Sequence, residues 1–141
     1  MSEILSYRGT VYPWHCDHMG HMNVMWYVGK FDEALWSFLA GLGLGPGYLK
    51  ANGRGMAAVQ QVIQYQRELM AGDVVEIRCR VQALREKAIV VHQVMRNIEQ
   101  DHVAATLELT GVHLDTAQRR AVPFAGEIRS RMLEHFPSAC E

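Results

Sequence analysis

Residues 24–40 carry the longest run of apolar side chains at the three- and four-residue spacing of an α-helix. The residues on this apolar face are Val24, Tyr27, Val28, Phe31, Ala34, Leu35, Phe38 and Leu39, and those largely between them are Lys30, Asp32, Glu33 and Ser37. Asn23 is the predicted N-cap, because its side chain can accept a hydrogen bond from an unpaired backbone N–H, and the glycines from Gly41 onward end the helix. Such a helix must bury its broad apolar face against a second layer.

Five other segments have the patterns of β-strands. They span residues 4–12, 56–67, 73–83, 88–98 and 103–114. Residues 73–83 alternate apolar and polar side chains most cleanly, whereas residues 88–98 begin apolar on both faces, as a central strand does. In the first segment, Leu5, Tyr7 and Val11 share the apolar face. In the last, the apolar phase passes from Leu109 to Val112, which predicts a β-bulge near Gly111. Because short turns join the later strands, we expect antiparallel pairing.

A four-residue period returns after Pro123 and predicts a short C-terminal helix; its apolar positions are Phe124, Ile128, Met132 and Phe136. The order of elements is therefore a strand, a long helix, four strands and a short helix. This order predicts an α+β fold, in which the long helix packs on a five-stranded antiparallel sheet. The glycine-rich patterns that bind nucleotide phosphates are missing from the sequence. We expect residues 1–141 to form a single domain.

Composition narrows the class of protein further. The chain has 141 residues, of which 49% are hydrophobic, and its formal net charge is -1. These values are typical of a globular domain and give no general attraction to nucleic acid or to an anionic membrane. The three cysteines, Cys16, Cys79 and Cys140, form no CxxC pair, and an odd number does not favour a secreted disulfide framework. With neither a signal peptide nor a membrane-spanning run in the sequence, we expect a cytoplasmic protein.

Residues 14–23, with the sequence WHCDHMGHMN, stand immediately before the predicted long helix and contain three of the seven histidines. A helix N-terminus presents unpaired N–H groups and a partial positive charge, and can therefore stabilise a developing oxyanion. Asp17 is close enough in the sequence to add a carboxylate. This combination suits acyl transfer, in which a carboxylate activates or performs the attack while backbone donors stabilise the tetrahedral intermediate.

The same segment has the residues for two other chemistries. A metal site built from His15, His18 and His21 with Cys16 and Asp17 matches no standard zinc spacing, and no second cluster supplies further ligands, so we expect no metal. A Cys16 nucleophile paired with a histidine is chemically feasible, but only proximity in the sequence supports it, which favours a packed structural thiol.

The sequence resembles the hotdog-fold acyl-CoA thioesterases of the 4-hydroxybenzoyl-CoA thioesterase type from about residue 7 to residue 123. The residues that carry the resemblance are Asp17, Gly20, His21, Met22, Asn23, Tyr27, Phe31, Glu33 and Ala34, followed by Gly72 and Asp73. The resemblance implies a five-stranded antiparallel sheet wrapped around one central helix. It also implies homodimers or homotetramers with active sites at the subunit interface.

The resemblance assigns roles by position. Asp17 corresponds to the catalytic carboxylate, acting as nucleophile or as general base toward water. The backbone N–H of Val24 would be the oxyanion donor, Gly20 would let the chain turn tightly under the thioester, and His21 and Asn23 would shape and brace the loop. Many relatives have a second asparagine at the position of Val24, but the proposed role needs only its backbone.

Substrate contacts follow in the same way. Tyr27 would pack under the acyl pocket, and Arg85 and Lys87 are the candidates for contacting CoA phosphates. The resemblance thus implies an enzyme that hydrolyses an acyl-CoA to the free acid and CoA, without a cofactor. Two alternatives are a non-catalytic module that binds acyl-CoA in the same pocket and a hydratase of enoyl thioesters.

Overall fold

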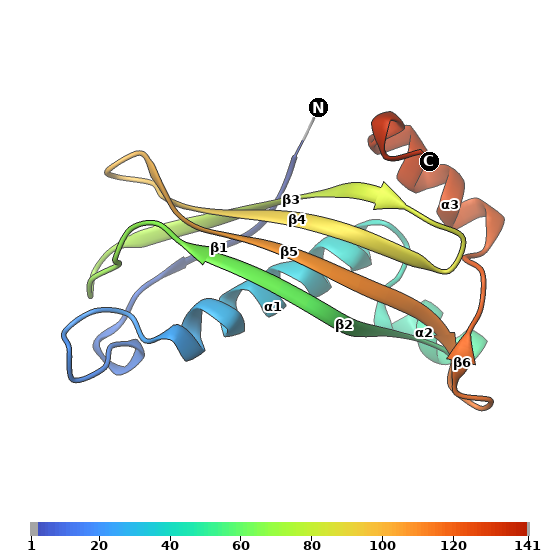
Figure 1. Cartoon of the computed structure of the whole chain (residues 1–141), viewed down its shortest axis with the longest axis horizontal. Coiled ribbons are helices and arrows are strands. Elements are labelled where there is room, and N and C mark those ends of the chain that lie inside the picture. The colour runs from blue at the N-terminus through green and yellow to red at the C-terminus, as the bar shows by residue number, and fades with distance from the viewer. Residues whose placement is uncertain (1–2, 141) are drawn as a thin grey trace.

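The computed structural model describes residues 3–140 and contains one antiparallel sheet with one long helix on it (Figure 1). The strands are β1 (Ile4–Thr10), β2 (Arg54–Tyr65), β3 (Val74–Leu84), β4 (Ala88–Asn97), β5 (His102–Asp115) and β6 (Arg120–Ala121). The helices are α1 (Val24–Gly41), α2 (Pro46–Asn52) and α3 (Gly126–His135), with short 3-10 turns η1 (Pro13–His15) and η2 (Pro137–Ala139). The strand order is β1-β3-β4-β5-β2, and the two-residue β6 pairs with β5. The predicted α+β architecture with a short C-terminal helix is confirmed.

The core lies between α1 and the curved sheet. From α1 it includes Phe31, Ala34, Phe38 and Leu39, and from the sheet Ile77, Val91, Met95 and Leu107. Burial of each such large side chain stabilises the fold by about 1.5–3 kcal/mol, so this apolar seam fixes the position of α1 on the sheet. The four apolar residues around α3 that recur every fourth position are all buried, as their spacing predicts.

Three local predictions are corrected by the structure, and one short helix was not predicted. Leu5 is 44% exposed rather than inward-facing, because the register of β1 against β3 shifts between Leu5 and Tyr7. The buried phase of β5 does not change at Gly111, since the next buried residue is His113 and not Val112. The irregularity lies instead in the partner strand β2, between Ala58 and Gln60.

The third correction and the unpredicted helix concern α1 and the segment after it. Lys30, placed among the polar positions of α1 by its sequence, is only 3% exposed. The segment between Gly41 and Gly55 contains α2, which was not predicted from the sequence because glycines flank and interrupt it. Proline at its first position and Gly53 in the left-handed conformation at its C-cap define its ends.

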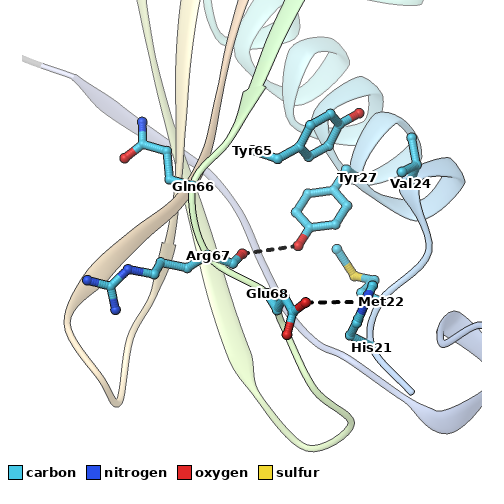
Figure 2. A pocket seen from close by; sticks show the side chains of 8 residues that line it. All are labelled: His21, Met22, Val24, Tyr27, Tyr65, Gln66, Arg67 and Glu68. Carbon is cyan, nitrogen blue, oxygen red and sulfur yellow. Dashed lines mark hydrogen bonds and ion pairs between the residues drawn. The ribbon is translucent and has the colours of Figure 1, made fainter. Parts of the chain in front are cut away.

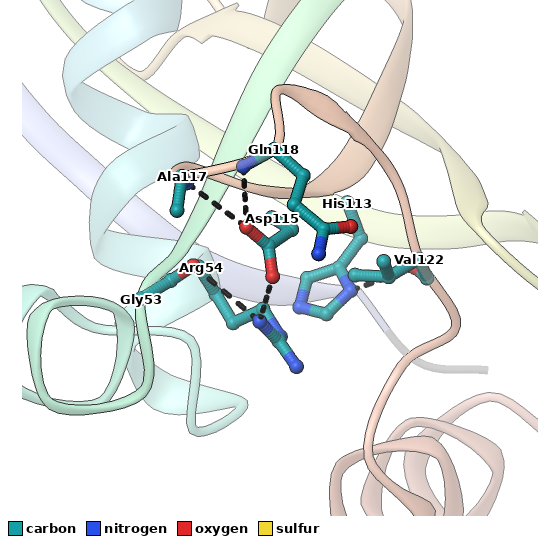
Figure 3. Close-up of polar contacts among 7 residues, drawn as sticks. All are labelled: Gly53, Arg54, His113, Asp115, Ala117, Gln118 and Val122. Atoms are coloured by element: carbon teal, nitrogen blue, oxygen red, sulfur yellow. Dashed lines mark hydrogen bonds and ion pairs between the residues drawn. The ribbon is translucent and has the colours of Figure 1, made fainter.

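A polar cluster around Asp115 lies at the end of the sheet near the C-terminus of α1 (Figures 1 and 3). Asp115 accepts hydrogen bonds from the backbone N–H groups of Ala117 and Gln118 at 2.9 and 2.8 Å. Its other oxygen accepts from Arg54 Nη1 at 2.9 Å. The carboxylate therefore ties the β5–β6 turn to the beginning of β2. Within residues 3–140, no helix combines the length and the apolar character that a bilayer-spanning segment needs.

Candidate active site

The segment between β1 and α1 folds back on itself next to the N-terminus of α1. Asp17 N donates to His21 O at 3.0 Å, and Gly20 N donates to Asp17 O at 3.0 Å. Gly20 has a φ of +91°, in the region that favours glycine, so it makes the tight turn predicted for it. Met22 N donates to Leu69 O at 2.7 Å, which fastens this loop to the β2–β3 connection.

The Asp17 carboxylate is held by two hydrogen bonds. Met19 N donates to Oδ1 at 2.9 Å, and Asn23 Nδ2 donates to Oδ2 at 3.2 Å. Partial desolvation is the largest single effect on the pKa of Asp17 and raises it. The two hydrogen bonds, with the nearby His21 and His18, outweigh that effect and lower the pKa below its usual value. The carboxylate is therefore ionised at neutral pH, as a nucleophile or general base must be.

Asn23 links this carboxylate to the start of α1. Its Oδ1 accepts from Met25 N at 2.8 Å, which is the predicted N-cap bond, while its Nδ2 donates to Asp17. Val24 is the first residue of α1, and among residues 3–140 its backbone N–H has no hydrogen-bond acceptor. An unpaired N–H at this position carries the positive end of the helix dipole and can bind a developing oxyanion.

A pocket of about 210 Å³ lies between the first turns of α1 and the end of β2 (Figure 2). Its lining residues are His21, Met22, Val24, Tyr27, Tyr65, Gln66, Arg67 and Glu68. Tyr27 OH donates to Arg67 O at 3.3 Å, and His21 Nε2 lies 3.4 Å from Glu68 Oε2. The pocket is largely apolar where Tyr27 packs edge-to-face on Tyr65, with ring centroids 5.1 Å apart.

The hydroxyl of Tyr27 stays protonated over the neutral range. Burial, followed by the neighbouring Tyr65 and Glu68, raises the pKa of Tyr27 to about 12. Tyr27 therefore contributes shape and a neutral hydroxyl to the pocket.

The structure brings together some of the residues singled out from the sequence and separates others. His21, Val24 and Tyr27 line the pocket, whereas Asp17, Gly20 and Asn23 form the loop beside it without lining it within one chain. Arg85 and Lys87 are exposed in the β3–β4 turn, at the opposite end of the sheet from this loop (Figure 1). Their contact with CoA stays a prediction, and within one chain the structure does not bring them to this pocket.

Sequence reasoning missed the wall contributed by residues 65–68. These residues end β2 and begin the connection to β3, and no local pattern shows that this connection crosses the tip of α1. Within the described residues, no group of three or more His, Cys, Asp and Glu side chains is arranged to hold a metal ion. Cys16 is a free thiol whose Sγ lies 3.8 Å from Tyr12 O.

Comparison with known proteins identifies the class. The model of the Thioesterase-like superfamily matches residues 11–132. A betainyl-CoA thioesterase from Pseudomonas aeruginosa is 25% identical over 133 residues, covering 94% of this chain and 84% of the relative. A Staphylococcus aureus protein in complex with CoA has a TM-score of 0.90 at 19% identity, covering 98% of this chain and 87% of the other. A Synechocystis 1,4-dihydroxy-2-naphthoyl-CoA thioesterase has a TM-score of 0.83 at 14% identity, covering 94% and 97%.

The antiparallel sheet wrapped along one long helix is thus a hotdog fold, as the sequence resemblance implies. The chain belongs to the Thioesterase-like superfamily and is a thioester hydrolase.

Proposed function

We propose that this protein hydrolyses an acyl-CoA thioester to the free acid and CoA. The observation that carries the proposal is the pairing of the unsatisfied Val24 N–H with an ionised Asp17, joined through the side chain of Asn23. Support for CoA comes from two similar proteins that are CoA-thioester hydrolases and from a similar structure that holds CoA.

In this proposal the thioester carbonyl oxygen points at Val24 N–H, beside the pocket that Tyr27 lines. Attack on the carbonyl carbon turns the C=O group into a tetrahedral oxyanion, which the N–H and the helix dipole stabilise. Collapse of this intermediate breaks the C–S bond, and the sulfur leaves as the CoA thiolate. Removing one such donor typically slows an enzyme by about 10²–10³-fold.

Two routes use the Asp17 carboxylate. As a general base it takes a proton from water, and the resulting hydroxide attacks the thioester. As a nucleophile it attacks directly and forms a mixed anhydride, which water then hydrolyses. A single turnover in ¹⁸O-labelled water, followed by mass analysis of the tryptic peptide that contains Asp17, tests the nucleophilic route. Labelled aspartate establishes this route, whereas unlabelled aspartate is expected both from the general-base route and from attack of water on the substrate carbonyl of the anhydride. Label in the aspartate requires the anhydride and attack of water on its aspartyl carbonyl.

We further propose that two chains pair to complete the site. β2 is an edge strand of the sheet with exposed apolar side chains at Val59, Val62 and Tyr65, and Tyr65 also lines the pocket. An exposed apolar edge strand is a template for pairing with another chain. A second copy along β2 would cover this edge and wall off the loop that holds Asp17. Sedimentation velocity is expected to show a dimer or a tetramer, and a monomer at micromolar concentration would contradict the pairing.

The test of the proposed activity is thiol release from a panel of acyl-CoA compounds with aromatic, short aliphatic and cationic acyl groups. Asp17→Asn is expected to lower kcat by about 10²–10⁴-fold for every active substrate. Asp32→Asn, a change at an exposed aspartate on α1, is the matched control and is expected to keep the wild-type rate.

Two results would overturn this assignment. Equal rates for Asp17→Asn and the wild type would remove Asp17 from the chemistry. Binding of acyl-CoA without thiol release, or addition of water across an enoyl group with the thioester intact, would exclude hydrolysis as the activity.

A further inference from the structure

A second pocket, of about 460 Å³, lies against another face of α1, between β1, the segment 12–15 and the helix. The α1 residues that line it are Trp26, Lys30 and Glu33, at four- and three-residue spacing, and they do not overlap with those that line the first pocket. The thioesterase site described above leaves this pocket without a role.

Lys30 is the buried polar group of this pocket. Its side chain is 3% exposed and lines the cavity. Nζ donates one hydrogen bond, to Tyr7 OH at 2.9 Å, and lies 5.2 Å from the centroid of the same ring. No carboxylate among residues 3–140 forms an ion pair with it. An ammonium group has three donors, and a buried cation without an anionic partner is costly, so this arrangement favours an anion in the cavity.

Residues of β1 leave room for the second pocket beside Lys30. A Cβ atom at Gly9 would collide with the Tyr7 ring and hydroxyl, so the glycine makes room for the tyrosine that positions Lys30. Gly9 also lines the pocket.

His15 supplies a second donor. Its Nδ1 accepts a hydrogen bond from Tyr12 N at 2.9 Å, so the neutral ring carries its proton on Nε2. Burial, and next the charge of Lys30, lower the pKa of His15, while Glu33 acts in the opposite direction. The ring is therefore neutral at pH 7, and its Nε2–H has no acceptor among the described residues.

Aromatic rings form one wall of the pocket. Tyr12 and Trp14 stack with centroids 4.7 Å apart and planes 8° apart, and Trp14 is 68% exposed. His15 and Trp26 continue this wall, with centroids 4.5 Å apart. Exposed stacked aromatic rings are unusual on a surface that binds nothing, and they offer a flat apolar face to a planar ligand.

We propose that this second pocket binds a small planar organic anion. The anionic group lies against Lys30 Nζ and His15 Nε2–H, and the planar body lies against Trp14 and Trp26. Glu33 is the acidic residue of the pocket lining, and its side chain is exposed, so solvent and salt screen its repulsion of the anion. A cation would instead meet the buried ammonium of Lys30.

Benzoate is the probe for this proposal, with benzamide as its neutral analogue and benzyltrimethylammonium as a cationic one. Titration monitored by tryptophan fluorescence and by saturation-transfer NMR is expected to show saturable binding of benzoate and at least 10-fold weaker binding of benzamide. Lys30→Met, which keeps the length of the side chain, is expected to weaken benzoate binding by about 10- to 100-fold. Glu33→Gln is expected to leave benzoate affinity unchanged or to raise it.

Two further variants keep the test independent of folding and of the thioesterase site. Trp14→Ala changes an exposed side chain and is expected to weaken benzoate binding by several-fold in a fully folded protein. Asp17→Asn is expected to bind benzoate as the wild type does, because Asp17 does not line the second pocket. Failure of the thioesterase proposal would therefore not affect this one.

Three results would overturn the proposal. The first is equal affinity for benzoate and benzamide, which shows that the charge is not recognised. The second is unchanged benzoate affinity in folded Lys30→Met or in Trp14→Ala. The third is preferred binding of benzyltrimethylammonium that strengthens in Lys30→Met and weakens in Glu33→Gln, which would make the rings a cage for cations.

Discussion

Asn23 joins helix capping to the candidate catalytic carboxylate, and two substitutions at this position separate the two roles. Asn23→Ala removes both the cap bond to Met25 N and the bond to Asp17 Oδ2, which measure 2.8 and 3.2 Å. Asn23→Asp keeps an N-cap acceptor of equal quality and adds a charge that the helix dipole favours, but it replaces the Nδ2–H donor with a second carboxylate beside Asp17.

The two variants are expected to differ in stability and to agree in activity. Loss of the cap costs about 1 kcal/mol, which corresponds to a fall in Tm of about 4 °C for a domain of this size, so Asn23→Ala melts earlier at every pH. Asn23→Asp keeps the cap, and repulsion between its carboxylate and that of Asp17 lowers its Tm only at pH values where both are ionised. Both variants remove the hydrogen bond from Asn23 Nδ2 to Asp17 Oδ2, so the carboxylate is no longer held in place. Misplacement of a reacting group by about 1 Å can lower the rate by about 100-fold. We therefore expect kcat/KM to fall about 100-fold in both.

The assay is thiol release as a function of pH, with Tm measured by circular dichroism in the same buffers. In Asn23→Asp the acidic limb of kcat/KM is expected to move to higher pH, because a neighbouring carboxylate raises the pKa of Asp17. Wild-type kcat/KM in Asn23→Asp, or an activity loss that follows Tm across the two variants, would refute the positioning role of Asn23.

Three further predictions follow from other contacts. In Asp115→Asn, Tm is expected to fall relative to the wild type at pH 7. Backbone hydrogen bonds and Arg54 lower the pKa of Asp115 in the folded state. The Asp115 carboxylate therefore stabilises the wild-type fold above pH ~4, and this stabilisation disappears as pH falls through the folded-state pKa. A Tm difference that grows toward pH 3 would contradict this. Tyr27→Phe loses the 3.3 Å hydrogen bond to Arg67 O and is expected to destabilise the protein by about 1 kcal/mol. The pH profile of kcat between pH 6 and 9 is expected to stay the same, because the hydroxyl has a pKa of about 12. A fall in kcat toward pH 9 that occurs in the wild type and not in Tyr27→Phe would contradict this. Phe38→Ala is expected to lower the free energy of unfolding by about 3–5 kcal/mol in urea titrations, and a loss below 1 kcal/mol would show that the core relaxes around the gap.

The sequence predicted the elements whose signals are local. The apolar period of α1 and the capping side chain of Asn23 depend on neighbours within a few residues, and both are confirmed. The loop that holds Asp17 and Gly20 could also be located, because it lies between a strand and a capped helix. The catalytic role of these residues stays a prediction that the experiments above test.

What the sequence did not predict depends on partners far along the chain. Lys30 is buried because Tyr7 of β1, 23 residues earlier, covers it. Residues 65–68 line the first pocket because β2 ends beside the tip of α1, a position set by the strand order. The phase of β5 was misjudged because the irregularity that opposes Gly111 belongs to β2.

The rate of Val24→Pro tests the proposed oxyanion donor. Proline is favoured at the first position of a helix and lacks only the N–H that is unpaired here, and Asn23, with φ of -71° and ψ of 147°, already has the conformation that a following proline requires. Val24→Ala, which keeps the N–H, is the matched control. If Val24 N–H is the oxyanion donor, we expect an unchanged Tm for Val24→Pro, a kcat lowered by about 10²–10³-fold, and near wild-type kcat for Val24→Ala. A folded Val24→Pro protein that hydrolyses its substrate at the wild-type rate would show that Val24 N–H does not stabilise the oxyanion.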